Sequence, residues 1–506
     1  MQVSSPPDGD GSLGRVSYRW VAMGVCLVGT FMVVLDTTIV NLALPSLQRE
    51  YHTIDGVEWV VTAYLAAVGV SQMGSSWFAD RFGRKRSFVV TLSVFTIGSA
   101  MCAASPTLPL LVFSRIVQGV GGGMLIPITM AMIYELFEPE ERGRALGIWG
   151  VAVMAAPAIG PVLGGTVITE IGWRWLFLVN VPIGLVGVPL AMRLLRETHG
   201  GEPRRLDTAG LVGAGSAIVL LLIGLAQGGT SGFGSASALI PLAASAIVAI
   251  GFLRHTLNSE SPIVDLRILT HPVFARAMTV LVILSVAQFA RLVYIPLELG
   301  TTRHITAFTI GLVMLPQAFG IAIMMPIGGR LADRIGARVP AVVGIAIFAA
   351  SFFALSNLSS TTSLPYVAAC LFFGGLGTGL SMMPPNVMAM NSVPTRKVSQ
   401  ATALSQVSRQ LAAAVGTAVL AAVLASLRPE GNLRAPATVA ATIDAYDTIF
   451  MIVCVMLVIA ALLAFRLPGK EGALALQAER KRERGILREI GELDLETESG
   501  LAAEVL

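Results

Sequence analysis

Charged residues are scarce in this chain: they make up 13% of its 506 residues, whereas hydrophobic residues make up 54%. A single soluble core cannot bury so many apolar side chains. The basic residues lie in short loops between apolar runs instead of gathering on one domain, which argues against a nucleic-acid partner. The phosphate-binding pattern GxxxxGK followed by Ser or Thr is also absent, so the chain has no recognisable ATP site.

Cysteine and histidine are equally sparse. The five histidines lie in loops, and no Ser/His/Asp arrangement stands out. The four cysteines lie inside apolar runs, at intervals that fit neither a disulfide framework nor a metal site, so we interpret them as small lipid-facing or core residues: Cys26, Cys102, Cys370 and Cys454. We therefore predict that the protein is not an enzyme and needs no metal or cofactor.

Runs of about 20 apolar residues recur along the chain, and each is long enough to cross a hydrocarbon layer of about 30 Å as a helix. The sequence thus predicts an all-α polytopic membrane protein. We count fourteen candidate spans, at roughly 20–44, 58–78, 87–104, 108–131, 144–168, 175–195, 208–227, 236–253, 274–297, 307–328, 339–356, 364–388, 403–427 and 446–465.

The basic residues indicate the orientation of the spans. If the N-terminus is cytoplasmic, inner segments hold 27 of the 35 Lys and Arg residues and outer loops hold 5. The positive-inside rule then places both termini in the cytoplasm of a bacterial cell, with the spans in its inner membrane. The first fourteen residues have no apolar run, so we predict a short tail there and not a signal peptide.

One turn sequence occurs twice, 253 residues apart. The pattern apolar-Ala-Asp-Arg-apolar-Gly-x-basic follows the second span and the tenth, and we interpret both copies as conformational latches, with a plain anchor loop as the alternative: Asp80, Arg81, Gly83 and Arg84, then Asp333, Arg334 and Gly336. Asp80 can accept hydrogen bonds from the start of the neighbouring helix, and Gly83 allows the reversal.

The repeat predicts two parallel halves of six helices. The two spans between them contain no charged residue from Gly210 to Leu253, so we assign them a packing role. The predicted organisation is a cytoplasmic tail, an N-terminal half, two inserted spans with a linker, a C-terminal half and a second cytoplasmic tail, at 1–19, 20–195, 196–260, 261–466 and 467–506.

Ionisable residues inside spans are costly, so they are candidates for proton coupling and for the substrate cavity. Asp36 lies within the first span, as a proton carrier or as a structural hydrogen-bond partner. Arg115 and Gln118 lie on one face of the fourth span, where Arg115 either meets a carboxylate or tunes a proton site. Arg291 and Glu298 share one face of the ninth span; Arg291 is deep enough to line a cavity, whereas Glu298 is near the surface and equally compatible with solvation.

The fifth span is rich in small residues and proline. Its small residues suit close helix packing, and its prolines remove backbone donors, so we predict a kinked hinge helix, with ordinary small-residue packing as the alternative. The residues concerned are Gly147, Pro157, Gly160, Pro161, Gly164 and Gly165.

Together these motifs resemble the major facilitator superfamily, in particular its fourteen-span drug:proton antiporter branch. The resemblance is carried by LDTTIVNLALP at 35–45, the turn at 80–86, Arg115 with Gln118-Gly119, GPVLGG at 160–165, and WRWLF at 173–177 followed by Asn180, Pro182 and Gly184. Three positions depart from the branch: Ser76 and Ala156 replace glycines, and Glu298 stands where relatives often have Gln.

The resemblance implies a proton:substrate antiporter that exports amphipathic drugs or similar small molecules by alternating access. A lipophilic or cationic substrate, the proton gradient as energy source and a monomer in the bilayer are the corresponding expectations. A proton-coupled importer on the same fold is the alternative. A membrane-embedded sensor or lipid-modifying enzyme is an alternative of another class, but the tail after Lys470 is too short for a catalytic fold.

Overall fold

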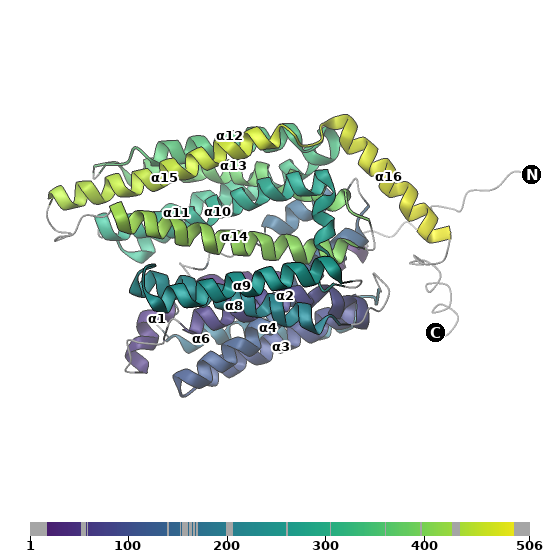
Figure 1. Cartoon of the computed structure of the whole chain (residues 1–506), viewed down its shortest axis with the longest axis horizontal. Coiled ribbons are helices and arrows are strands. Elements are labelled where there is room, and N and C mark those ends of the chain that lie inside the picture. Colours follow the sequence, from purple (N-terminus) through teal and green to yellow (C-terminus); the bar gives the residue numbers. More distant parts are fainter. Residues whose placement is uncertain are drawn as a thin grey trace, which may run out of the picture.

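Long helices with nearly parallel axes form the bundle, and α16 (Lys470–Glu489) is inclined to them (Figure 1). The computed structural model describes residues 18–51, 57, 59–138, 141–151, 153, 160, 164, 167, 171–198, 206–259, 262–303, 305–359, 361–394, 397–427 and 436–489. Within these residues the only contact of β type is an isolated bridge between Gly336 and Gly469. Helices suit a chain this apolar, because each helix satisfies its own backbone hydrogen bonds in lipid.

The described helices, in chain order, are α1 (Tyr18–Glu50), α2 (Trp59–Phe82), α3 (Arg84–Ala104), α4 (Leu108–Leu136), α6 (Arg174–Leu178), α7 (Asn180–Leu194), α8 (Thr208–Ser231), α9 (Ala236–Asn258), the 3₁₀ helix η1 (Leu266–Thr270), α10 (Pro272–Thr302), α11 (Ala307–Ile335), α12 (Arg338–Leu355), α13 (Leu364–Asn391), α14 (Val398–Leu427), α15 (Pro436–Ala464) and α16 (Lys470–Glu489). Residues 142–151 are also helical.

Twelve of the described helical segments are long and apolar enough to cross a membrane. The predicted count of fourteen is therefore not reached within the described part of the chain. The predicted second span is α2, a helix of 24 residues whose buried face carries polar side chains such as Ser71, Gln72 and Ser75, which lower its hydropathy. The predicted fifth span, 144–168, lies largely outside the described residues.

Two groups of three helices use the same close packing. In the first group, α2 and α3 both contact α4, where a Cβ on Gly121 would lie 2.5 Å from the backbone nitrogen of Phe95. In the second group, α11 and α12 both contact α13, where a Cβ on Gly377 would lie 2.5 Å from the backbone nitrogen of Phe348. Glycine at these points lets the helix backbones touch.

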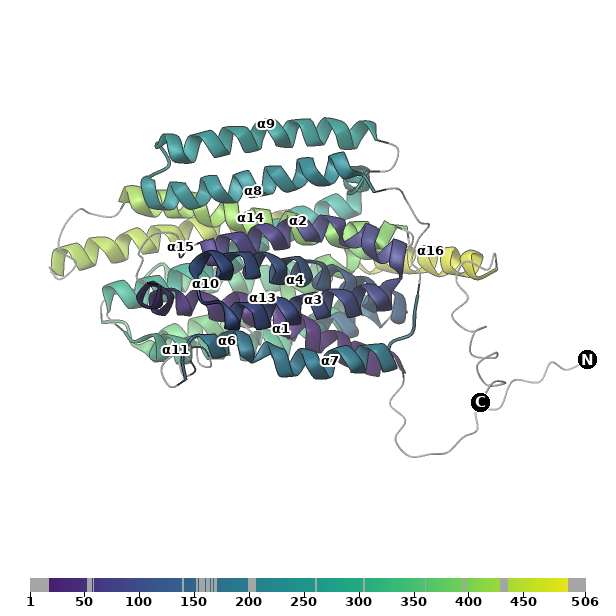
Figure 2. The same cartoon turned by 90° about the horizontal axis from the view of Figure 1, so that it is seen from below.

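Helices α8 and α9 form an outer layer (Figure 2). α8 packs against α2 and α14, and α9 packs mainly against α8. Only 11% of the most apolar stretch of α9 is buried inside the protein. The apolar side chains that α9 leaves exposed, such as Ile240 and Ile247, suit contact with lipid.

Both copies of the repeated turn adopt the same backbone conformation. Gly83 has φ +88° and Gly336 has φ +83°, a region that favours glycine. The residue after each glycine donates its N–H to the segment that follows a later helix: Arg84 to the Thr198 carbonyl at 2.9 Å, and Ala337 to the Pro468 carbonyl at 3.2 Å. We call the end of the bundle that carries these turns the turn end, and the opposite end the far end.

Candidate functional site

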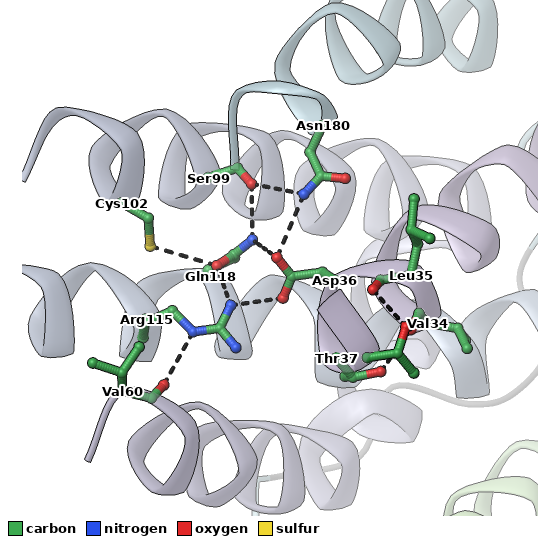
Figure 3. A network of polar contacts seen from close by, with 11 residues as sticks. Val34, Leu35, Asp36, Thr37, Val60, Ser99, Cys102, Arg115, Gln118 and Asn180 are labelled. Carbon is green, nitrogen blue, oxygen red and sulfur yellow. Dashed lines mark hydrogen bonds and ion pairs between the residues drawn. The ribbon is translucent and has the colours of Figure 1, made fainter. Parts of the chain in front are cut away.

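Five polar side chains from α1, α3, α4 and α7 meet inside the bundle (Figure 3): Asp36, Ser99, Arg115, Gln118 and Asn180. Arg115 Nη1 donates to Asp36 Oδ2 and to Gln118 Oε1, both at 2.6 Å. Gln118 Nε2 donates to Asp36 Oδ1 at 2.9 Å and to Ser99 Oγ at 2.8 Å. Asn180 Nδ2 donates to Asp36 Oδ1 at 3.4 Å and to Ser99 Oγ at 3.1 Å. We call this set the Asp36 network.

The Asp36 network is shielded from solvent. The side chain of Asp36 is 0% exposed and that of Arg115 is 1% exposed. Arg115 Nε donates to the Val60 carbonyl at 3.1 Å, and the guanidinium lies 3.8 Å from the centroid of the Tyr64 ring. Removing one member of a buried ion pair leaves the other charge uncompensated, which costs about 3–5 kcal/mol.

Glycines bring the neighbouring helices onto the face of α4 that carries this pair. A Cβ on Gly98 of α3 would lie 2.6 Å from the Gln118 backbone, and a Cβ on Gly119 would lie 2.7 Å from the Tyr64 carbonyl of α2. Arg115 and Gln118 are three residues apart, so they project from the same side of α4. Of the two interpretations that the sequence left open for Arg115, contact with a carboxylate is the one that the structure contains, and the carboxylate is that of Asp36.

Arg291 occupies a similar depth in α10, but in a different environment. Its Nη2 donates to Gln288 Oε1 at 2.6 Å and to Thr378 Oγ1 at 3.1 Å, and its guanidinium lies 4.6 Å from the Phe348 ring centroid. Its side chain is completely buried, and no described carboxylate forms an ion pair with it. The side chain of Arg291 is thus enclosed between its own helix, α10, and the neighbouring helices α12 and α13.

Glu298, seven residues after Arg291, is buried as well. Its exposed fraction is 1%, so the solvated alternative for this residue is wrong. Its Oε1 lies 3.4 Å from Arg303 Nε and accepts a hydrogen bond from Thr302 at 3.1 Å. Arg303 directly follows the last residue of α10, so this ion pair ties the end of the helix to its preceding turns.

The first turn is held by carboxylates from other segments. Arg84 is buried and forms an ion pair with Glu135 of α4, with an Nη2–Oε1 distance of 2.6 Å, while Asp80 lies 3.7 Å from the same guanidinium. The backbone N–H groups of Lys85 and Arg86 donate to Glu197, at 3.0 and 3.2 Å. Glu197 thus accepts hydrogen bonds from the first N–H groups of α3, a role that the sequence argument had assigned to Asp80; the latch role of Asp80 stays a prediction.

In the second turn, Arg334 is exposed, like Arg81 in the first. Gly336 N–H bonds to Ala332, and Arg338 Nε donates to the Leu467 carbonyl at 2.9 Å. The carboxylate of Asp333 points toward Gly143, because a Cβ on Gly143 would contact its Oδ2.

The segment that ends α4 and the helical residues 142–150 contact α11 and α13 at the turn end. Arg142 Nη1 donates to Asn391 Oδ1 at 2.7 Å, and Tyr134 Oη donates to the side chain of Asn386 at 3.1 Å. The backbones also touch directly: a Cβ on Gly143 would run into the Gly329 carbonyl, and one on Gly147 would lie 2.5 Å from Pro326 Cα. We call these contacts the turn-end seal.

The predicted hinge helix is only partly described. Gly147 lies in the turn-end seal, and Gly160 packs against α1, where an added Cβ would lie 2.6 Å from Thr38 Oγ1. Gly164 is helical and buried. Pro157, Pro161 and Gly165 lie outside the described residues, so the kink stays a prediction.

Several residues of these sites were missed by the sequence argument. Ser99 is a neutral residue within an apolar run and carries no signal that separates it from packing residues. Glu135 and Asn391 gave better signals, because each is a strongly polar residue near the end of an apolar run. Neither could be assigned a partner from the sequence, since the partners are distant along the chain.

The chain matches a family model described as Major Facilitator Superfamily, over residues 26–417 and 278–494. It is 31% identical over 397 residues to the MFS-type transporter YhcA of Bacillus subtilis, covering 78% of this chain and 75% of that one. It is 30% identical over 406 residues to the multidrug resistance protein B homolog of Mycobacterium tuberculosis, covering 79% and 75%. The tetracenomycin C resistance and export protein of Streptomyces glaucescens is 27% identical over 409 residues, covering 80% and 76%.

Two solved structures share the fold. The proton:xylose symporter XylE superposes with a TM-score of 0.61 at 16% identity, covering 91% of this chain and 99% of that one. The human organic anion transporter MFSD10 superposes with a TM-score of 0.60 at 15% identity, covering 87% and 99%.

Proposed function

The chain belongs to the major facilitator superfamily, and we propose that it is a proton:substrate antiporter that exports amphipathic small molecules. Proteins of this family are transporters and not enzymes. The observation that carries the proposal is the buried Asp36–Arg115 pair, an ionisable couple within apolar helices. The relatives named for multidrug resistance and for tetracenomycin C export support the direction of transport.

The proposed topology has fourteen spans, with both termini cytoplasmic. Helix α2 supplies a thirteenth span, because it lies between α4 and α8 in the bundle although its hydropathy is low. The fourteenth is the predicted fifth span, of which residues 144–151, 153, 160, 164 and 167 are helical. Two halves of six helices, 20–195 and 261–466, would then flank the inserted α8 and α9. Tags at the two termini that differ in accessibility between intact cells and inverted vesicles would locate them.

The Asp36 network is proposed to couple proton movement to substrate movement. Asp36 accepts bonds from three side chains here, so its carboxylate can take up a proton only as the Arg115 guanidinium withdraws. A movement of α1 relative to α4 would change that distance. Arg291 and Glu298 belong to the same proposal, as groups that the substrate or the proton meets in the C-terminal half. The proposed substrate is lipophilic or cationic. The proposed transport unit is a monomer.

Alternating access is proposed to work through the turn end. Substrate from the cytoplasm can pass between the halves only if the turn-end seal opens, because backbone touches backbone at Gly143 and Gly329. The turns at Asp80 and Asp333 lie beside that seal and are proposed to act as its latches. The glycine-rich helix from Gly147 to Gly165 is proposed to be the hinge.

A proton-coupled importer remains the second candidate, since XylE, a proton:xylose symporter, has the same fold. The two candidates differ in the direction of coupled flow. In inverted membrane vesicles with an acidic lumen, an antiporter accumulates substrate and a symporter does not. A panel of cationic and lipophilic compounds, selected by growth inhibition with and without the gene, provides the substrates to test.

Energy coupling is tested in the same vesicles. A protonophore should abolish accumulation, whereas depletion of ATP should not if the pH gradient is held by other means. Asp36→Asn should abolish uphill transport yet retain downhill exchange, because Asn has the same shape as Asp but cannot release a proton. Asp444→Asn, on the exposed surface of α15, is the matched control and should transport like the parent. Accumulation that survives the protonophore would refute proton antiport.

A further inference from the structure

Only one of the three nitrogens of the buried Arg291 guanidinium is hydrogen-bonded. Nη2 donates to Gln288 Oε1 and to Thr378 Oγ1. Nε and Nη1 are buried, and neither finds an acceptor among the described groups. Of the five N–H groups of a guanidinium, the three on these two nitrogens are therefore unpaired. Buried donors without acceptors are unfavourable, and more so when they are charged, so this part of the side chain favours a negatively charged acceptor.

The helices around Arg291 offer no such acceptor at its depth. Helices α12, α13 and α14 contain no Asp or Glu, and α14 adds a second arginine, Arg409. The described carboxylates of α10, α11 and α15 lie toward the ends of these helices: Glu298, Asp333, Asp444 and Asp447. Glu298 is already ion-paired with Arg303. Because a guanidinium stays protonated in proteins, Arg291 cannot become neutral by releasing a proton.

The equivalent place in the N-terminal half is occupied differently. Gly121 of α4 and Gly377 of α13 are equivalent points, since each packs in the same way on the backbone of a neighbouring helix. Three residues before them stand Gln118 and Gly374. Gln118 donates to the buried charge of its half, the carboxylate of Asp36, which Arg115 neutralises. Position 374 has no side chain that could act on the buried charge of the C-terminal half.

Gly374 instead lets the guanidinium lie against α13. A Cβ at this position would lie 2.7 Å from Arg291 Nη1 and 2.5 Å from Ser351 Oγ. The hydroxyl of Ser351 donates to the Cys370 carbonyl at 2.7 Å and forms no hydrogen bond with Arg291. The guanidinium is enclosed here, so a ligand reaches it only when α10 and α13 move apart. Alternating access would supply such a movement.

We propose that Arg291 binds an anionic group through its unpaired N–H groups. The anionic group is either a free monovalent anion such as chloride or the carboxylate of a transported molecule. The site is distinct from the Asp36 network and has the opposite charge. The second source rests on the proposed export, and it would favour lipophilic substrates with an acidic group over their neutral analogues. The existence of the site does not depend on that source.

Thermal unfolding of the purified full-length protein tests the site without any transport. The probe is chloride, exchanged at constant ionic strength for a bulky sulfonate. If the anion is free, chloride should stabilise the parent along a saturating curve. At ten times the half-saturating concentration, the ratio of folded to unfolded protein should rise about 11-fold.

Three variants show whether Arg291 is responsible for this response. Arg291→Gln should not respond to chloride, and Arg291→Lys, which keeps the charge but not the planar donors, should respond more weakly than the parent. The matched control is Arg254→Gln on the exposed surface of α9, which should respond like the parent. The dependence on chloride is compared and not the absolute stability, so a variant of altered stability is still informative. A response that persists in Arg291→Gln would place the anion elsewhere and overturn the proposal for chloride.

Transport tests the second source. A lipophilic carboxylic acid and its amide are compared as inhibitors of the uptake of a reference substrate into inverted vesicles. If the substrate supplies the anionic group, half-inhibition should need about 10- to 150-fold less of the acid than of the amide, the range expected for a hydrogen bond to a charged group. Arg291→Gln should remove this preference, and Arg254→Gln should retain it.

The two assays together decide the proposal. A chloride response without a preference for the acid assigns the site to a free anion, and a preference that is lost in Arg291→Gln assigns it to the substrate. The absence of both overturns the proposal. If the parent transports nothing, the proposed function fails, and the chloride response alone then decides whether the site exists.

Discussion

The Gly143→Ala substitution is expected to open the turn end. A Cβ at this position would run into the carbonyl of Gly329 and the carboxylate of Asp333. The first of these is backbone, so no side-chain rotation can relieve the overlap, and the two helices must separate. Overpacking of this kind costs about 1–3 kcal/mol. The same free energy changes the ratio of closed to open molecules by about 5- to 150-fold.

Distances between spin labels on the two sides of the seal measure this change. Arg86→Cys and Val339→Cys suit the labels, because both side chains are exposed and lie beyond Gly83 and Gly336. The longer-distance population should grow with Gly143→Ala. The control is Gly251→Ala on α9, where an added Cβ meets nothing within 4 Å. A distribution with Gly143→Ala that matches the parent would show that this contact does not hold the turn end closed.

Three further outcomes are expected. Asp80→Asn should lower transport while the amount of protein in the membrane, measured by immunoblot, stays at the parent level; loss of the protein would make Asp80 structural. Arg115→Lys should abolish uphill transport in vesicles although the charge is kept, because Lys cannot donate both to Asp36 and, from the Nε position, to the Val60 carbonyl; parent-like transport would contradict this. Burial alone would raise the pKa of Asp207, but hydrogen bonds from Gly210, His255 and the Ile263 backbone outweigh it and hold that pKa below its ordinary value. As the cap of α8, Asp207 should stabilise the parent over Asp207→Ala by about 1 kcal/mol above pH of about 4, and this difference should vanish as the pH falls through the lowered pKa; a difference in thermal unfolding midpoint that is constant with pH would refute it.

Much of the helical arrangement could be predicted from the sequence, because a membrane penalises both exposed backbone and isolated charge. Asp36 and Arg115 were singled out by that penalty alone. Their pairing was not predictable, since it requires α1 to lie beside α4, and nothing in either segment specifies its neighbour. The positive φ of Gly83 and Gly336 followed from the repeated turn, whereas the capping of that turn by Glu197 depends on the path of the chain after α7.

The burial of residues at the far end was only partly visible in the sequence for a different reason. The predicted last span began near residue 446, but α15 begins at Pro436. The Thr and Asp residues of its first turns lower the local hydropathy, so the predicted span omitted the start of α15. Glu298 was ambiguous because its partner Arg303 lies beyond the end of α10, where the sequence does not show how the chain continues.

The tie between each turn and a distant segment has a consequence for synthesis. The Arg84 N–H has its acceptor only after Thr198 has been made, and the Ala337 N–H only after Pro468. Each stretch of chain from the turn to its acceptor is therefore a loop that can close only after its last residues have been synthesised. The first loop can close before α8 has been synthesised, while the chain is still on the ribosome. The second must wait until nearly the whole chain has been translated, so a truncation before Pro468 leaves it open.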